Sequence, residues 1–187
     1  MRDSFTEQRT ERKVGFMGNM KSTASKKYRN ILVVYYSRTG STRKVAEYIT
    51  KQLSADMETI IDMKKRSGAF GFVIGGMDAL MRKETEISEI KKDPSKYELV
   101  IMGSPLWAGN IPPAIRTYLN KYKADIKSVA FFATSGGSSQ GKIFEEARSL
   151  IGKELISFMG ICTKELNDDS VFEAKLSSFI ESLTQKK

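Results

Sequence analysis

The sequence of 187 residues contains no histidine and a single cysteine, Cys162. The lack of histidine excludes histidine general bases, most zinc sites and Ser-His or Cys-His nucleophile pairs. One cysteine excludes an internal disulfide and is typical of a reducing compartment, so we expect a cytoplasmic protein. No apolar run reaches the roughly 18–20 residues of a membrane span. The longest candidate, Ala69–Met81, is shorter and contains glycine and aspartate, so we expect no membrane span.

Acidic residues are too few to balance the charge, and the net charge is +9. Residues 1–29 contain eight Lys or Arg and three acids, and thus hold +5 of this excess. Residues 1–28 are polar without a clear period, which predicts a disordered or loosely attached extension before one domain over residues 29–187. The extension is either a solvated tail or a contact for an acidic protein, nucleic acid or anionic lipid. No nucleic-acid motif is present, so we expect no nucleic-acid partner.

Short apolar runs alternate with helical patterns along the rest of the chain, which predicts an α/β protein with one parallel sheet covered on both faces. The helix over residues 69–82 is expected to turn Phe70, Val73, Ile74, Met77 and Leu80 or Met81 inward. The last helix is expected to start with a capping box at Ser170. Strands are predicted over residues 31–36, 58–61, 98–103, 129–134 and 155–163.

A turn rich in hydroxyl groups follows the first predicted strand, and a helical pattern follows the turn. Its residues are Ser37, Arg38, Thr39, Gly40, Ser41 and Thr42. The first amides of a helix lack internal partners, and the helix dipole adds partial positive charge there. Such a turn therefore suits a phosphate group, although an ordinary capped strand–turn–helix has the same pattern.

This turn resembles the phosphate loop of the flavodoxin family, and the resemblance extends over residues 29–185. It implies a flavodoxin-like three-layer sandwich with a five-stranded parallel sheet of order 2-1-3-4-5. It also implies that residues 37–42 hold the monophosphate of FMN. We expect FMN rather than FAD, because no G-x-G-x-x-G pattern follows a strand.

The loop after the third strand contains the one tryptophan of the chain. The resemblance implies that this loop binds the isoalloxazine ring through Pro105, Leu106, Trp107, Ala108, Gly109 and Asn110. Trp107 would pack on one face of the ring, although a core position for it stays open. Gly109 would turn its peptide toward flavin N5 with little strain. Ala108 and Asn110 depart from the family pattern of glycine beside the aromatic and an acid beyond.

The loop after the fourth strand is rich in small residues. Those that the resemblance places along the ring edge are Thr134, Ser135, Gly136 and Gly137. No aromatic lies between Thr134 and Ile143 to cover the second ring face. The loop also nearly matches an ATP-binding motif, but Ile143 stands where a magnesium ligand is needed. A phosphoacceptor receiver domain is excluded because aspartates are missing at the ends of the first and third strands.

Three functions are compatible with these features. The first is an FMN-dependent electron carrier between redox partner proteins. The second is an NAD(P)H-dependent FMN oxidoreductase that reduces a quinone-like acceptor, and whether the chain is an enzyme stays open. The third is a binding or assembly protein without flavin. The basic charge counts against the first, because carrier flavodoxins are usually acidic, but the resemblance still favours it. No catalytic acid or base and no metal is expected, since the flavin carries the redox chemistry, and the sequence carries no signal for oligomeric state.

Overall fold

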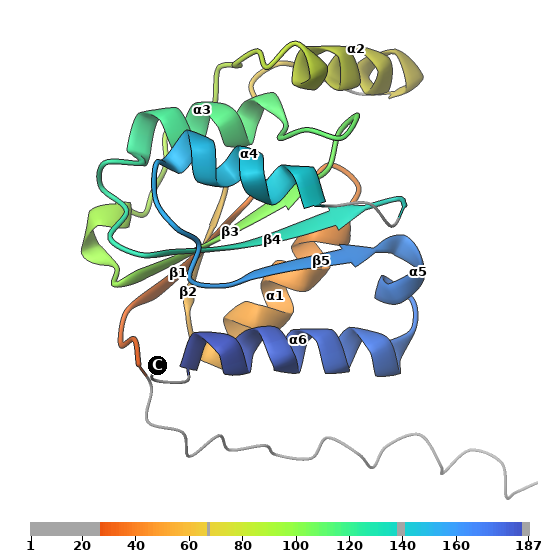
Figure 1. The fold of residues 1–187 in the computed structure, drawn as a ribbon. Helices are drawn as coiled ribbons and strands as arrows, with labels where there is room; N and C mark the ends of the chain where they lie inside the picture. The colour runs from red at the N-terminus through yellow and green to blue at the C-terminus, as the bar shows by residue number, and fades with distance from the viewer. Residues whose placement is uncertain (1–26, 67, 138–140, 185–187) are drawn as a thin grey trace, which may run out of the picture.

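The computed structural model describes residues 27–66, 68–137 and 141–184. Five parallel strands form one sheet through the middle of the molecule, with helices on both faces (Figure 1). The strand order is β2-β1-β3-β4-β5, which confirms the predicted three-layer fold. The elements are β1 Ile31–Tyr35, α1 Ser41–Leu53, β2 Asp56–Thr59, α2 Gly68–Leu80, a 3-10 turn Pro94–Lys96, β3 Leu99–Pro105, α3 Pro113–Tyr122, β4 Val129–Ser135, α4 Gly141–Ile151, β5 Phe158–Cys162, α5 Thr163–Leu166 and α6 Asp169–Thr184.

The three central strands are buried because helices cover both of their faces. β1 is buried along its whole length, and β3 and β4 are buried except at their last residues. Such strands carry continuous apolar runs instead of alternating ones, which is the pattern of the sequence. In β3, the ring of Phe132 would lie 2.2 Å from a Cβ atom at Gly103, so only glycine fits there.

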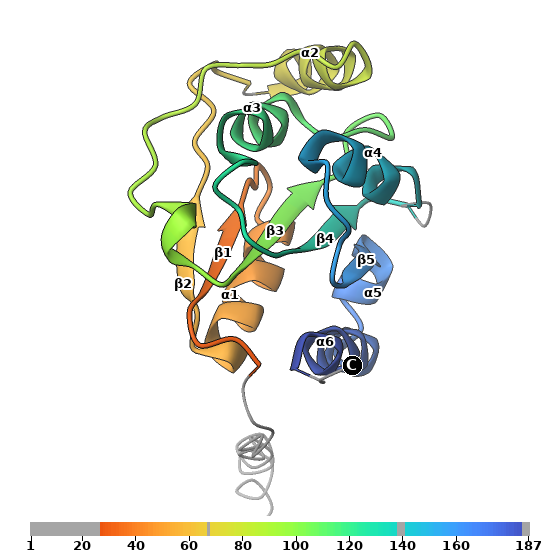
Figure 2. The same cartoon turned by 60° about the vertical axis from the view of Figure 1, so that its left-hand side comes forward.

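Two apolar layers flank the sheet. One lies between the sheet and helices α3 and α4, and the other lies between the sheet and helices α1 and α6 (Figure 2). The helices contribute stripes with the expected period, such as Val45, Ile49 and Leu53 of α1. Burial of these stripes supplies most of the stabilisation of such short helices.

Helix α2 forms where a helix was predicted, but the prediction of its buried face was wrong. Phe70, Val73, Met77 and Leu80 are exposed, and so is Met81 just beyond the helix. The inner face instead carries small or charged residues. These are Gly71, Gly75, Asp78 and Ala79. Figure 1 shows α2 as the outermost element, beyond α3 and away from the sheet.

The C-terminal part differs from expectation in two details. The carboxylate of Asp168, rather than Ser170, caps α6 by accepting hydrogen bonds from the amides of Ser170 and Val171. Strand β5 is shorter than expected: it begins at Phe158 instead of residue 155, and it ends at Cys162 because Thr163 begins the short helix α5. None of the helices in the described part of the chain is long and apolar enough to cross a membrane.

Candidate functional site

The loops after β1, β3 and β4 meet at the carboxyl edge of the sheet, as a switch point between strands predicts. Two hydrogen bonds connect these three loops, each of which the sequence analysis predicted as part of the site from its own residues. The hydroxyls of Thr42 and Thr134 lie 2.8 Å apart, and the amide of Leu106 donates to the carbonyl of Thr134 at 2.8 Å. The structure therefore brings all three predicted loops together.

The loop after β1 leaves the start of α1 open. Gly40 is the N-cap and adopts a left-handed conformation with φ 97°, and no side chain caps the helix. A Cβ atom at Gly40 would meet no atom within 4 Å. The amide of Gly40 donates to Ser37 Oγ at 3.2 Å, which folds the loop back on itself. The next three amides, those of Ser41, Thr42 and Arg43, have no partners inside the helix and are available to an anion, whereas the amide of Lys44 already donates to the carbonyl of Gly40 at 2.9 Å.

The hydroxyl groups of this loop do not all face the same way. Thr42 is buried, and its hydroxyl is engaged by Thr134. Thr42 thus fixes the helix start to β4, while Thr39 and Ser41 remain partly or fully accessible. We infer that the side chains most suited to a phosphate are those of Thr39 and Ser41, with positive charge from Arg38 and Arg43 nearby.

The loop after β3 is a tight reverse turn. Trp107 and Asn110 exchange two backbone hydrogen bonds of 3.1 and 2.9 Å. The two residues between them, Ala108 and Gly109, have φ angles of 46° and 80°. Positive φ at both positions is the geometry of a type I′ turn, and alanine adopts it with strain. The amide of Ile111 donates to the Glu146 carboxylate of α4 at 2.9 Å, which anchors the far end of the loop.

Trp107 is nine-tenths buried, so the structure gives it the core position that the sequence left open. Its ring meets the edge of Tyr36 at a centroid distance of 5.5 Å. Gly75 of α2 packs on it so closely that a Cβ there would lie 2.8 Å from the indole. The Arg38 guanidinium lies 5.2 Å from the ring centroid. A planar ligand therefore reaches the indole face only after Arg38 or α2 moves.

The loop after β4 is described up to Gly137. Ser135 is half-buried and donates a hydrogen bond from its hydroxyl to the carbonyl of Gly137. Gly136 and Gly137 are exposed, and no atom lies within 4 Å of an added Cβ at either. They leave the backbone accessible to a ring edge. Residues 138–140, which belong to the stretch that nearly matches an ATP-binding motif, lie outside the described residues.

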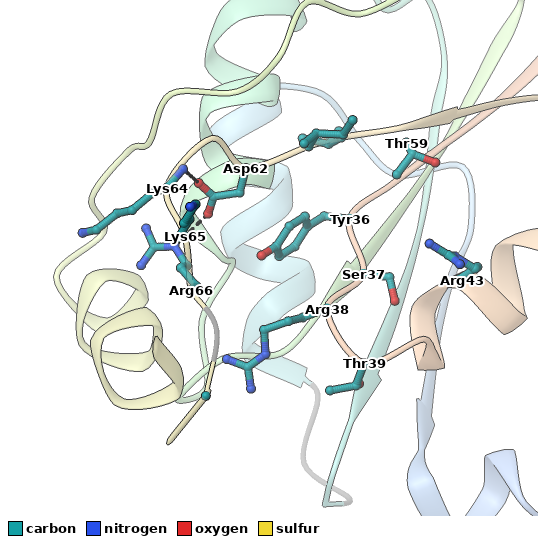
Figure 3. Close-up of a pocket in the computed structure, with 13 residues that line it drawn as sticks. Tyr36, Ser37, Arg38, Thr39, Arg43, Thr59, Asp62, Lys64, Lys65 and Arg66 are labelled. Atoms are coloured by element: carbon teal, nitrogen blue, oxygen red, sulfur yellow. Dashed lines mark hydrogen bonds and ion pairs between the residues drawn. The ribbon is translucent and has the colours of Figure 1, made fainter. Parts of the chain in front are cut away.

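A cavity of about 600 Å³ opens beside the phosphate loop (Figure 3). The sequence analysis predicted only Ser37, Arg38 and Thr39 of its wall. The side chains of Ser37 and Thr39 lie on one side, and those of Asp62 and Arg66 on the other. The cavity is lined by Tyr36, Ser37, Arg38, Thr39, Arg43, Thr59, Ile60, Ile61, Asp62, Lys64, Lys65, Arg66 and Gly68.

The cavity wall is positively charged and held rigid by ion pairs. Arg66 is buried and contacts the carboxylates of Asp62 and Asp78, each at 2.7 Å. Lys64 and Lys65 add exposed positive charge. Burial, and then the charge of Asp62, raise the pKa of Tyr36 to about 12. Tyr36 is therefore protonated at neutral pH and faces the cavity as a hydrogen-bond donor (Figure 3).

No group of three or more candidate metal ligands occurs among the residues that the structure describes. Apart from the Asp62 carboxylate, the site consists of backbone amides, hydroxyl groups, cationic side chains and one buried indole. Such a set suits an anionic, planar ligand.

Comparisons with known proteins agree with this fold. The flavodoxin family model matches residues 73–182. A flavoprotein from Lactobacillus acidophilus, crystallised in complex with FMN, is 24% identical with a TM-score of 0.63, and the match covers 81% of this chain and 99% of that chain. Oxidised flavodoxin 2 from Bacillus cereus is 20% identical with a TM-score of 0.52, covering 83% and 97%. A search of curated proteins found no match. Since the family model spans more than half of the sequence, the chain belongs to the flavodoxin family.

Proposed function

We propose that this chain is an FMN-binding electron carrier that passes electrons between redox proteins. The observation that carries the proposal is the open start of α1. Gly40 leaves the helix N-terminus without a side-chain cap, and nothing occupies the space beside it. In a flavodoxin family chain, this arrangement suits the FMN monophosphate. The FMN-bound flavoprotein from Lactobacillus acidophilus supports the same cofactor.

The residues of the chain bind and orient the cofactor. The first free amides of α1, from Ser41 to Arg43, and the hydroxyls of Thr39 and Ser41 would hold the phosphate through charge-assisted hydrogen bonds. Trp107 would shield the ring from water, and Gly109 would present its peptide to the ring. The exposed backbone at Gly136 and Gly137 would line the ring edge. FMN, when bound, supplies the redox chemistry by accepting and releasing electrons.

The cavity beside the phosphate loop favours a second function. It is lined by five cations and one acid, and it has room for part of a phosphate-bearing ligand. An NAD(P)H-dependent oxidoreductase needs such a place for its anionic hydride donor. The small residues of the β4 loop also leave space for a planar molecule to stack.

The deciding experiment combines a spectrum with a turnover assay. The purified protein is soaked in FMN and titrated with a chemical reductant under anaerobic conditions. We expect bound FMN, reduction in two separate one-electron steps, and negligible oxidation of NADH or NADPH with a soluble quinone. Turnover above roughly 1 s⁻¹, the lower end of ordinary enzymes, would contradict the electron-carrier function and favour the NAD(P)H-dependent oxidoreductase. Failure to bind FMN would contradict both functions and favour an assembly protein.

A further inference from the structure

Helix α2 turns a stripe of large apolar side chains toward solvent. Phe70 is 83% exposed, Val73 59%, Met77 56% and Leu80 64%. Their spacing of three and four residues places them on one face of the helix. Exposed apolar side chains occur singly on most proteins, but a continuous stripe marks an interaction surface.

The inner face of α2 explains why this stripe points outward. Gly75 lies against the indole of Trp107, where no larger residue fits. Ala79 is fully buried, and Asp78 is held by Arg66 at 2.7 Å. The helix is thus fixed in its orientation by small-residue packing and an ion pair, so the exposure of the stripe is a consequence of its anchoring.

The stripe has a positively charged rim. Lys64 and Lys65 lie before the helix, and Arg82 and Lys83 lie after it, and all four are exposed. The acids between residues 61 and 83 are Asp62 and Asp78. Their side chains are only 5% and 9% exposed, and both contact Arg66. Asp78 also pairs with Lys64 and Lys83, and the exposed acids Glu84 and Glu86 follow Lys83, so the positive charge that this face presents is carried mainly by Lys65 and Arg82.

We infer that the face formed by the stripe of α2 and its four rim cations, which we call the α2 face, docks an acidic redox protein. This inference rests on the proposed function as an electron carrier. An apolar centre with a charged rim is the usual build of a protein interface. A surface of these eight residues is smaller than the roughly 20–30 of a stable interface, and suits the brief encounters of electron transfer.

The position of the α2 face supports a redox partner over other occupants. Gly75 and Gly76, on the inner face of α2, lie over Trp107 and Ala108, so a protein seated on the outer face is separated from the predicted ring site by the thickness of one helix, about 10–12 Å. A second copy of the chain in a two-fold arrangement would bring the same cations together, which costs energy. An anionic lipid surface matches the charge, but it does not account for the place of the stripe above the redox site.

The test uses a soluble acidic cytochrome b5 domain as the probe. The FMN-loaded protein is reduced with dithionite, freed of excess reductant, and mixed with ferric cytochrome in a stopped-flow instrument. Each electron that leaves the flavoprotein reduces one ferric haem to ferrous haem. We expect the rate to fall with ionic strength. We also expect it to fall about tenfold or more in Val73→Asp/Met77→Asp and in Lys65→Glu/Arg82→Glu.

Matched variants separate the α2 face from the overall charge. Lys51→Glu/Lys127→Glu changes the net charge equally on exposed sites elsewhere, and Ile156→Asp/Phe158→Asp places acids on other exposed apolar side chains. Both control pairs should keep rates near that of the unmodified protein. Equal slowing by test and control pairs, or no slowing by either test pair, would overturn the inference.

Two further measurements address the other occupants. A stable dimer in sedimentation velocity that Met77→Asp dissolves would assign the face to a second copy, and sedimentation with phosphatidylserine vesicles would assign it to lipid. Either result would overturn the inference. FMN affinity is measured for every variant by fluorescence. Loss of FMN by the unmodified protein would contradict the proposed function, whereas slow transfer by a variant that keeps FMN concerns docking alone.

Discussion

At Asp78, one carboxylate is surrounded by three cations. Arg66 lies 2.7 Å from it, Lys64 3.0 Å and Lys83 3.6 Å. The hydrogen bond from Arg66 is the main reason that the pKa of Asp78 is lowered to about 2. Because the pKa is lower in the folded state than in the unfolded chain, this group stabilises the fold above the unfolded pKa.

We predict that Asp78→Asn lowers the free energy of unfolding by about 2 kcal/mol at pH 7. In the unmodified protein, the contribution of Asp78 should be lost as the pH falls from about 4 to about 2. Denaturant titrations at pH 7 and pH 3 measure both effects. Asp56→Asn is the control, since Asp56 is an exposed acid paired with Lys92 and Tyr97. The same loss of stability in both variants would show that the buried cluster has no special role.

The phosphate loop yields a second prediction at this scale. Thr39→Ala with Ser41→Ala should weaken FMN binding by about 1–3 kcal/mol for each charge-assisted hydrogen bond lost. The fold should persist, because neither side chain belongs to the buried core. Thr50→Ala, near the other end of α1, serves as the control. Unchanged affinity of the double variant in a fluorescence titration would mean that the phosphate binds elsewhere.

Among the elements, α2 shows where sequence reasoning reached its limit. The strands and helices follow from apolar periodicity, because burial on both faces of the sheet imposes continuous runs and helical stripes. The same logic wrongly placed the large residues of α2 inside. The face that packs inward must be small because Trp107 lies beneath it. That contact joins residues more than thirty positions apart, and no local pattern reports it.

The packing of α2 on Trp107 predicts opposite effects for two neighbouring glycines. Gly76→Ala should stabilise the protein by about 0.5–1 kcal/mol, because alanine favours a helix and its Cβ would lie 3.9 Å from Ala108, an ordinary contact. Gly75→Ala should lose that gain or destabilise by about 1–3 kcal/mol, because its Cβ would lie 2.8 Å from the indole.

Trp107 is the one tryptophan of the chain, so its fluorescence reports this contact directly. Emission should move to longer wavelength in Gly75→Ala and stay in place in Gly76→Ala. Thermal melts of both variants give the stability. Identical emission and melting temperature in the two variants would contradict the packing of α2 on the indole.

At the scale of the whole molecule, the sequence predicted which loops meet, but it did not predict which other residues form the wall of the cavity beside them. Strand order follows from alternating strands and helices, and the loops after β1, β3 and β4 meet because their strands are neighbours. The part of the cavity wall formed by Asp62, Lys64, Lys65, Arg66 and Gly68 could not be predicted, because it depends on a salt-bridge cluster that joins the β2–α2 loop to α2. Tyr36 was not predicted as a cavity residue because it ends an apolar run, where a side chain is expected to belong to the hydrophobic core.

The described residues contain the complete sheet, both apolar layers and the site. We therefore predict that deleting residues 1–19 changes the melting temperature by less than about 2 °C, equivalent to under 1 kcal/mol for a domain of this size. FMN affinity should also stay the same, since the deletion removes four cations and three acids and alters the net charge by one. Calorimetry and fluorescence titration of the shortened chain provide the measurements, with the full chain at equal ionic strength as the reference. A large fall in melting temperature would show that the deleted segment packs on the domain, and weaker FMN binding alone would show that it contributes to the site.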